Sequence, residues 1–164
     1  MASLATFQPA VVAYEDDTVA WADAQVALLR DRRFGDIDLV NIIEEIEGVA
    51  KTARTALASQ SGRITEHLLK LIYSPAKDPR RGWIESIVDA RREIDRTLDD
   101  SPSLRRELDE IIARNAARDA KSAAQRLKIY GELDQRVERD LLAHRFTTAQ
   151  IVEDWLPPGV DIGR

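Results

Sequence analysis

The fold is decided by residues 36–73, which read DIDLVNIIEEIEGVAKTARTALASQSGRITEHLLKLIY. On a helical wheel at about 100° per residue, the apolar positions of this segment fall in one stripe of roughly 120° that never changes phase. The stripe consists of Leu39, Ile42, Ile43, Ile46, Val49, Ala50, Ala53, Leu57, Ile64, Leu68 and Leu71. A constant phase predicts one continuous helix, which Pro75 would terminate. A break near residues 59–62 is the alternative.

Two glycines in this segment, and its length, allow further predictions about packing and shape. Gly48 and Gly62 fall on the far side of the wheel, where we expect their missing side chains to remove no core contact. Each glycine still costs the helix about 1 kcal/mol of propensity. At 1.5 Å per residue the helix would be on the order of 55 Å long, beyond the ~30 Å of a small compact domain. We therefore expect it to organise an elongated bundle or to extend into a partner.

The rest of the chain repeats the helical period, and no segment alternates with the period of a strand. Helices are expected over residues 16–32, 83–98, 101–129, 132–143 and 147–154. Ser101 followed by Pro102 is a helix start signal, and Thr147 with Gln150 reads as a capping box. The pattern predicts an all-α fold: an elongated bundle of four main helices plus short C-terminal helices. We expect a single helical domain over residues 1–164, with irregular ends at about 1–14 and 157–164.

Composition narrows the functional classes. The 164 residues include 24 basic and 29 acidic side chains, and the net charge of −5 argues against nucleic-acid binding. The absence of cysteine excludes thiol chemistry, iron–sulfur clusters and cysteine-ligated zinc. Residues 1–14 lack the features of a secretory signal, and no stretch reaches the about 18 apolar residues of a membrane span. We expect a cytoplasmic protein with no membrane contact.

One polar residue stands where an apolar one is expected. Arg91 falls in the centre of the apolar stripe of residues 83–98, and a buried guanidinium without a partner costs several kcal/mol. Glu45 is a candidate partner, and Asp119 lies within the early stripe of the helix after residue 101. The candidate polar site consists of Asp38, Asn41, Glu44, Glu45, His67 and Arg91. These residues could form a structural Arg91–Glu45 ion pair, line a shared pocket, or pair across a subunit interface.

No established catalytic or metal-binding pattern occurs. The two histidines are too few for a three-histidine zinc site, and no Glu-x-x-His motif of a di-iron bundle is present. Asp140 and His144 share the i, i+4 spacing of a metal pair, but such pairs are more often surface hydrogen bonds. Dinucleotide, Walker and nucleophile-elbow motifs are also missing from the sequence. We therefore predict no metal and no cofactor, and the catalytic residues stay unknown.

A series of residues in a fixed order runs through most of the chain. The series comprises Trp21, Gln25, Leu28, Leu29, Arg30, Phe34, Asp38, Asn41, the run Glu44-Glu45-Ile46-Glu47, His67-Leu68-Leu69-Lys70, Trp83, Ile87, Arg91-Arg92, Ser101-Pro102-Ser103-Leu104-Arg105 and Glu153-Asp154-Trp155-Leu156-Pro157. In these residues the chain resembles the bacterial family catalogued as "domain of unknown function 29", from about Tyr14 to Pro157. The resemblance implies an α-helical, cytosolic bacterial protein, and it implies no activity. Residues 127–146 depart from the family's pattern, so we place no function there.

The hypothesis favoured by the sequence is a non-enzymatic interaction or assembly module that forms a homodimer. The overlong helix and the lack of a catalytic pattern support it. The alternative is a small-molecule or metal-dependent enzyme, in which Glu45 would act as base or ligand, His67 as acid–base group and Arg91 as anion clamp. Convergence of these three side chains in an accessible pocket would favour the enzyme.

Overall fold

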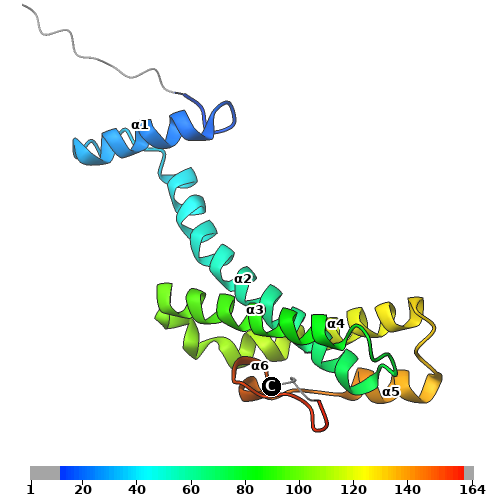
Figure 1. Ribbon diagram of the computed structural model, residues 1–164. Coiled ribbons are helices and arrows are strands. Elements are labelled where there is room, and N and C mark those ends of the chain that lie inside the picture. The colour runs from blue at the N-terminus through cyan, green and yellow to red at the C-terminus, as the bar shows by residue number, and fades with distance from the viewer. Residues whose placement is uncertain (1–11, 161–164) are drawn as a thin grey trace, which may run out of the picture. The chain divides into compact units, whose positions relative to one another are not determined.

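The computed structural model describes residues 12–160, in which every regular element is a helix, so the all-α prediction is confirmed (Figure 1). The elements are α1 (Thr18–Arg30), α2 (Leu39–Tyr73), α3 (Arg80–Asp100), the 3₁₀ helix η1 (Pro102–Arg106), α4 (Leu108–Ile129), α5 (Gln135–Ala143) and α6 (Thr148–Val152). The chain forms two compact units, one up to Ala50 and one from Lys51 onward.

Helix α2 runs without a break through 35 residues, as its apolar period predicts. It begins at Leu39 rather than near residue 36, because the Oδ1 atom of Asp38 accepts a hydrogen bond from the backbone N–H of Asn41 at 3.3 Å. This side-chain contact satisfies one of the free N–H groups of the first turn. The helix ends at Tyr73, two residues before Pro75.

The apolar stripe of α2 is buried in only one half of the helix. From Leu57 onward the apolar side chains of the stripe are buried, and Leu57, Ile64 and Leu68 expose none of their surface. In the first ten residues or so of the helix, Leu39, Ile43, Ile46 and Val49 are between 48% and 72% exposed. A helical period reports which side chains share a face, but burial of that face needs a packed neighbour.

Two clusters of buried side chains form the core of the C-terminal unit. The larger joins α2, α3, η1, α4 and α6 around residues such as Ile64, Ile87, Ile111 and Ile151. The smaller combines Leu69 of α2 with the alanine-rich end of α4 and with α5. Its members are Leu69, Ala120, Ala123, Ala124, Leu127 and Leu141. Small alanine side chains let a neighbouring helix come close, and at this end of α4 the neighbour in contact is α5.

Several helix boundaries differ from the expected ones. The segment after Ser101 forms the 3₁₀ helix η1, Ser101 makes no capping hydrogen bond through its side chain, and α4 starts only at Leu108. Short 3₁₀ turns are common at the start of α-helices, and sequence signals do not separate the two. The capping box of Thr147 and Gln150 is confirmed.

The expected irregular ends lie partly outside the described residues. In the described part, residues 12–17 and 157–160 contain no helix. Residues 1–11 and 161–164 are not described.

Candidate functional site

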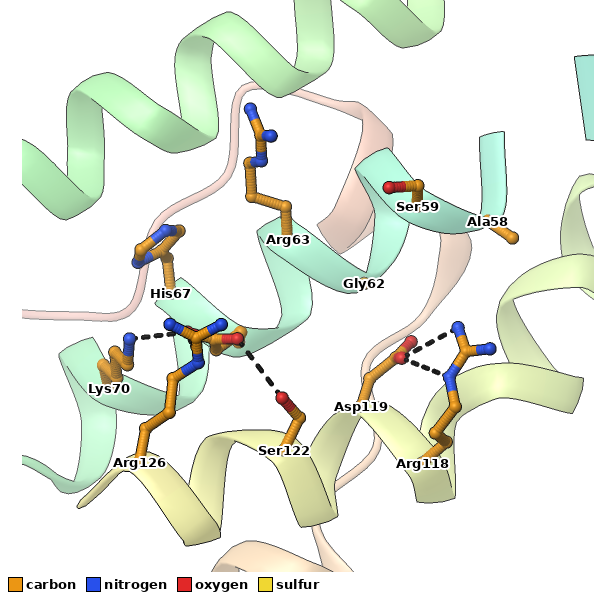
Figure 2. A pocket seen from close by; sticks show the side chains of 11 residues that line it. Ala58, Ser59, Gly62, Arg63, His67, Lys70, Arg118, Asp119, Ser122 and Arg126 are labelled. Carbon is orange, nitrogen blue, oxygen red and sulfur yellow. Dashed lines mark hydrogen bonds and ion pairs between the residues drawn. The ribbon is translucent and has the colours of Figure 1, made fainter. Parts of the chain in front are cut away.

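A polar cavity of about 400 Å³ lies between α2 and α4 in the C-terminal unit (Figure 2). Both helices contribute residues three, four and seven or eight positions apart, which stand on one face of a helix. The charged and polar lining residues from α2 are Ser59, Arg63, Glu66, His67 and Lys70, and those from α4 are Arg118, Asp119, Ser122 and Arg126. Residues on the two helices therefore face each other across the cavity.

Glu66 is the centre of an ion-pair network that joins the two helices. Its Oε1 atom lies 2.6 Å from the Nζ atom of Lys70 and 3.1 Å from the Nε atom of Arg126. Ser122 of α4 donates a hydrogen bond of 3.5 Å to the other carboxylate oxygen. The side chains of Glu66 and Lys70 are only 13% and 8% exposed, so water screens their attraction weakly. Figure 2 shows Lys70, Arg126 and Ser122 gathered at this end of the cavity.

Asp119 occupies the other end of the cavity, directly over Gly62. Its Oδ1 atom accepts hydrogen bonds from two N–H groups of Arg118, each at 3.3 Å. Burial raises the pKa of the Asp119 carboxyl above its ordinary value. A Cβ atom at Gly62 would lie 3.0 Å from this Oδ1 atom, which is closer than nearly all real Cβ contacts. Gly62 therefore makes room for the carboxylate.

The expectation that neither glycine of α2 matters for packing is thus confirmed for one and wrong for the other. A Cβ atom at Gly48 would meet nothing within 4 Å. Gly62 does stand off the apolar stripe, but its neighbour there is a buried carboxylate instead of solvent. The wheel could not show this, because the neighbour comes from α4.

His67 is the one member of the predicted polar site that lines this cavity. Burial lowers its pKa to about 4, and the positive charge of Lys70 acts in the same direction. Its Nδ1 atom is buried and has no hydrogen-bond partner in the described part of the chain. His67 is therefore a neutral imidazole at pH 7, with one ring nitrogen unused.

Arg91 is buried elsewhere in the same unit, beneath the end of α6. Its Nε and Nη2 atoms donate hydrogen bonds to the carbonyls of Ile151 at 2.9 Å, Gln150 at 2.9 Å and Trp155 at 2.7 Å. The carboxylate of Asp154 lies 3.9 Å away and is fully exposed. Burial lowers the pKa of Arg91. The need for acceptors was predicted, but the acceptors are backbone carbonyls rather than the expected carboxylate of Glu45.

The short helix α6 explains why Arg91 binds backbone carbonyls instead of a carboxylate. The last carbonyls of any helix lack donors from within the helix, and α6 is only five residues long. Arg91 satisfies two of these carbonyls and one from the following loop, so it holds the C-terminal segment onto α3. A guanidinium has five donors, which suits it to this task.

Asp38 and Asn41 lie together in the N-terminal unit, where they join α1 to α2. The Oδ2 atom of Asp38 accepts hydrogen bonds from the side-chain amide of Asn41 at 2.6 Å and from the indole of Trp21 at 3.2 Å. The backbone N–H of Asp38 donates to the side chain of Gln25 at 2.8 Å. The hydrogen bond from Asn41 is the main reason that the pKa of Asp38 is lowered. These contacts stabilise the turn between the two helices.

The two glutamates of the predicted site stand on the exposed part of α2. Glu45 accepts a hydrogen bond from the hydroxyl of Tyr14, and this contact raises the pKa of Tyr14. Glu44 is exposed. The structure therefore brings Asp38 and Asn41 into contact, and it places His67 and Arg91 at two different positions in the C-terminal unit. A pocket shared by all six residues stays a prediction.

Sequence reasoning did not select most of the residues that line the cavity. Arg63, Glu66, Arg118 and Arg126 look like ordinary charged positions beside an apolar stripe. One usable signal was Asp119, which falls inside the stripe of α4, and a second was a glycine within a long helix. Pairing these two signals across different helices required the tertiary structure.

Among residues 12–160 no group of three or more His, Asp or Glu side chains could hold a metal ion, and no helix is long and apolar enough to cross a membrane. The Nδ1 atom of His144 lies 2.9 Å from the hydroxyl of Tyr73.

Comparison with curated proteins and with solved structures found no match. The family described as "Domain of unknown function DUF29" matches residues 13–155, and the chain belongs to this family.

Proposed function

We propose that this protein is a non-enzymatic assembly module that pairs with a second copy of itself through the exposed apolar face of α2. The observation that carries the proposal is the row of large apolar side chains left uncovered on the N-terminal part of this helix. We define this row, together with the half-buried Ile42 that lies in line with it, as the α2 seam; it comprises Leu39, Ile42, Ile46 and Val49. As the resemblance implies, the module would act in the bacterial cytosol.

The spacing of the α2 seam is that of a coiled coil. Its members follow one another at alternating intervals of three and four residues, which places them at the a and d positions of two heptads. Ile46 and Val49 are 65% and 72% exposed, and Ile43 beside them is 48% exposed. A contiguous apolar row of this kind is typical of a surface that binds another helix.

A second copy of the chain suits the α2 seam because the row is self-complementary. In a parallel pair each a or d side chain meets its own counterpart, and the flanking Glu45 faces Ala50 across the seam, so no like charges oppose each other. Burying each of these side chains contributes roughly 1–2 kcal/mol, and both copies contribute. The total is of the same order as the about 4–15 kcal/mol that association costs.

The surroundings of Arg91 support the non-enzymatic proposal over the alternative enzyme. That enzyme needs Arg91 as a clamp for a substrate anion, but the described structure directs its Nε and Nη2 donors to three carbonyls of its own chain. His67 has its pKa lowered to about 4, so at neutral pH it lacks the proton of a general acid.

Light scattering on the full chain tests the proposal. We expect a mass of about twice 18.5 kDa for the wild type. The double variant Ile46→Lys/Val49→Lys should give a single-chain mass, because each lysine would place a charge in the seam. The matched control is Val40→Lys, since Val40 is 75% exposed on the same helix but outside the seam. It should remain dimeric.

Two results would count against the proposal. A wild-type chain that stays monomeric at high concentration would show that no copy covers the face. A double variant that remains dimeric would show that association uses another surface.

A further inference from the structure

The cavity between α2 and α4 carries a charge opposite to that of the whole chain. Its lining includes four cationic side chains, namely Arg63, Lys70, Arg118 and Arg126, and two carboxylates, namely Glu66 and Asp119. With a neutral imidazole at His67, the cavity has a net charge of +2, whereas the chain carries −5. Concentration of positive charge in a hollow with protein walls attracts anions.

The two carboxylates hold the cations in place without occupying all their donors. Glu66 binds Lys70 and Arg126 through one oxygen atom, and Asp119 binds Arg118 through one oxygen atom. Each arginine has five N–H groups and the lysine has three, so several donors are left over. Arg63 has no carboxylate within ion-pair distance among residues 12–160.

Further polar groups are available for a ligand. The ring of His67 lines the same cavity, and its Nδ1 atom has no partner in the described structure, whereas the one hydroxyl hydrogen of Ser122 is already donated to Glu66. Lys70 is held firmly, because its side chain is buried and its Nζ atom also lies 5.9 Å from the centre of the Trp83 ring. The donors on Lys70 are thus fixed before any ligand arrives, which lowers the entropy cost of binding.

The size and lining of the cavity limit the ligand class. A volume of about 400 Å³ is at the small end of ligand pockets. Apart from His67 the lining contains no aromatic side chain on which a nucleobase could stack, and its apolar part is limited to residues as small as Ala58. Arginine forks match the geometry of phosphate oxygens, and a dianion would balance the net charge of +2.

We infer that this cavity binds a small molecule that carries a phosphate group, with Lys70 and Arg126, which meet at Glu66, and Arg63 as its main contacts. This inference uses a different surface from the α2 seam and does not depend on dimer formation. Inorganic phosphate and a phosphomonoester present the same dianionic group, so the site would accept either. The proposed function and this site can therefore succeed or fail separately.

Calorimetric titration of the full chain at low ionic strength tests the inference. The probes are inorganic phosphate, glycerol 2-phosphate and, as a dianion without phosphorus, succinate. We expect both phosphates to bind with a Kd of about 1 mM or tighter, and succinate to bind at least about tenfold more weakly. Tighter binding of glycerol 2-phosphate than of phosphate would identify an organic phosphate as the natural ligand; equal binding would identify phosphate itself.

Charge-neutralising variants locate the site. Arg63→Gln and Arg126→Gln should each raise the Kd about tenfold, the effect of losing a charge-assisted hydrogen bond. The matched control is Arg96→Gln, which removes the same charge from an arginine that is 68% exposed on α3 and pairs with Glu93. Its Kd should stay unchanged. Unaltered helical circular dichroism confirms that each variant is folded.

A second readout follows the ring of His67 by NMR. A bound dianion should raise the pH at which His67 is half protonated, because negative charge favours the imidazolium form. The inference is overturned if neither phosphate binds, if succinate binds as tightly as phosphate, or if Arg96→Gln weakens binding as much as the cavity variants do.

Discussion

Replacement of Gly62 by alanine is expected to reveal the contact between α2 and the Asp119 carboxylate. A glycine-to-alanine change inside a helix normally increases the free energy of unfolding by about 1 kcal/mol. At Gly62 the new methyl group would lie 3.0–3.1 Å from three atoms of Asp119, which must therefore shift by a few tenths of an ångström. Overpacking of this kind costs about 1–3 kcal/mol. The net effect of Gly62→Ala should thus lie between no gain and a loss of about 2 kcal/mol.

A double-mutant cycle separates the two contributions. In an Asp119→Ala background the crowding is gone, so Gly62→Ala should recover the full stabilisation of about 1 kcal/mol. The coupling energy between the two positions should then be about 1–3 kcal/mol. Gly48→Ala is a further control in the same helix, because its methyl group would meet nothing within 4 Å.

Urea denaturation followed by circular dichroism provides the free energies, and an unchanged m-value shows that the surface exposed on unfolding is the same. The reasoning fails if Gly62→Ala stabilises the wild type as much as it stabilises the Asp119→Ala variant. In that case the Asp119 side chain would move aside without loss of stability, and Gly62 would be an ordinary helix glycine like Gly48.

Two other predictions concern Arg91 and His67. Arg91→Met keeps the bulk of the side chain but removes hydrogen bonds to three carbonyls. We therefore expect a loss of about 2–4 kcal/mol in the free energy of unfolding and faster proteolysis within residues 147–160. The control Asp154→Asn should change neither quantity, since that carboxylate is fully exposed. His67 has a pKa of about 4 in the folded chain against 6.5 for the free side chain, so between these values the unfolded chain binds more protons. Stability should therefore fall as the pH drops from about 6.5 to about 4, less steeply in His67→Gln, and an NMR midpoint for His67 near 6.5 would refute the prediction.

Most of the helices could be predicted, because their signals are local. The constant phase of the apolar stripe in residues 36–73 led to one helix, and α2 is unbroken from Leu39 to Tyr73. Pro75, the capping box of Thr147 and the cap provided by Asp17 to α1 act within a few residues of their own positions. Such signals depend on backbone hydrogen bonds between near neighbours in the chain, so the local sequence is enough to predict them.

The candidate site could be predicted only in fragments. The sequence predicts that Arg91 is a buried cation that needs hydrogen-bond acceptors. Backbone carbonyls carry no signature in a sequence, so the predicted acceptor is a carboxylate, that of Glu45. Asp38 and Asn41 share an edge of α2 as expected, yet their contacts with Trp21 show that they stabilise the junction with α1.

Two features depended wholly on packing between distant segments. One is the point along α2 where its apolar stripe becomes covered, between Val49 and Leu57. The other is the meeting of Glu66 with Arg126, and of Gly62 with Asp119, residue pairs that are 60 and 57 positions apart in the sequence. Helical periodicity determines the direction in which each side chain points. The residues that this side chain contacts are determined by how the helices pack. Packing depends on the burial of apolar surface from all segments of the chain together, so local sequence does not reveal it.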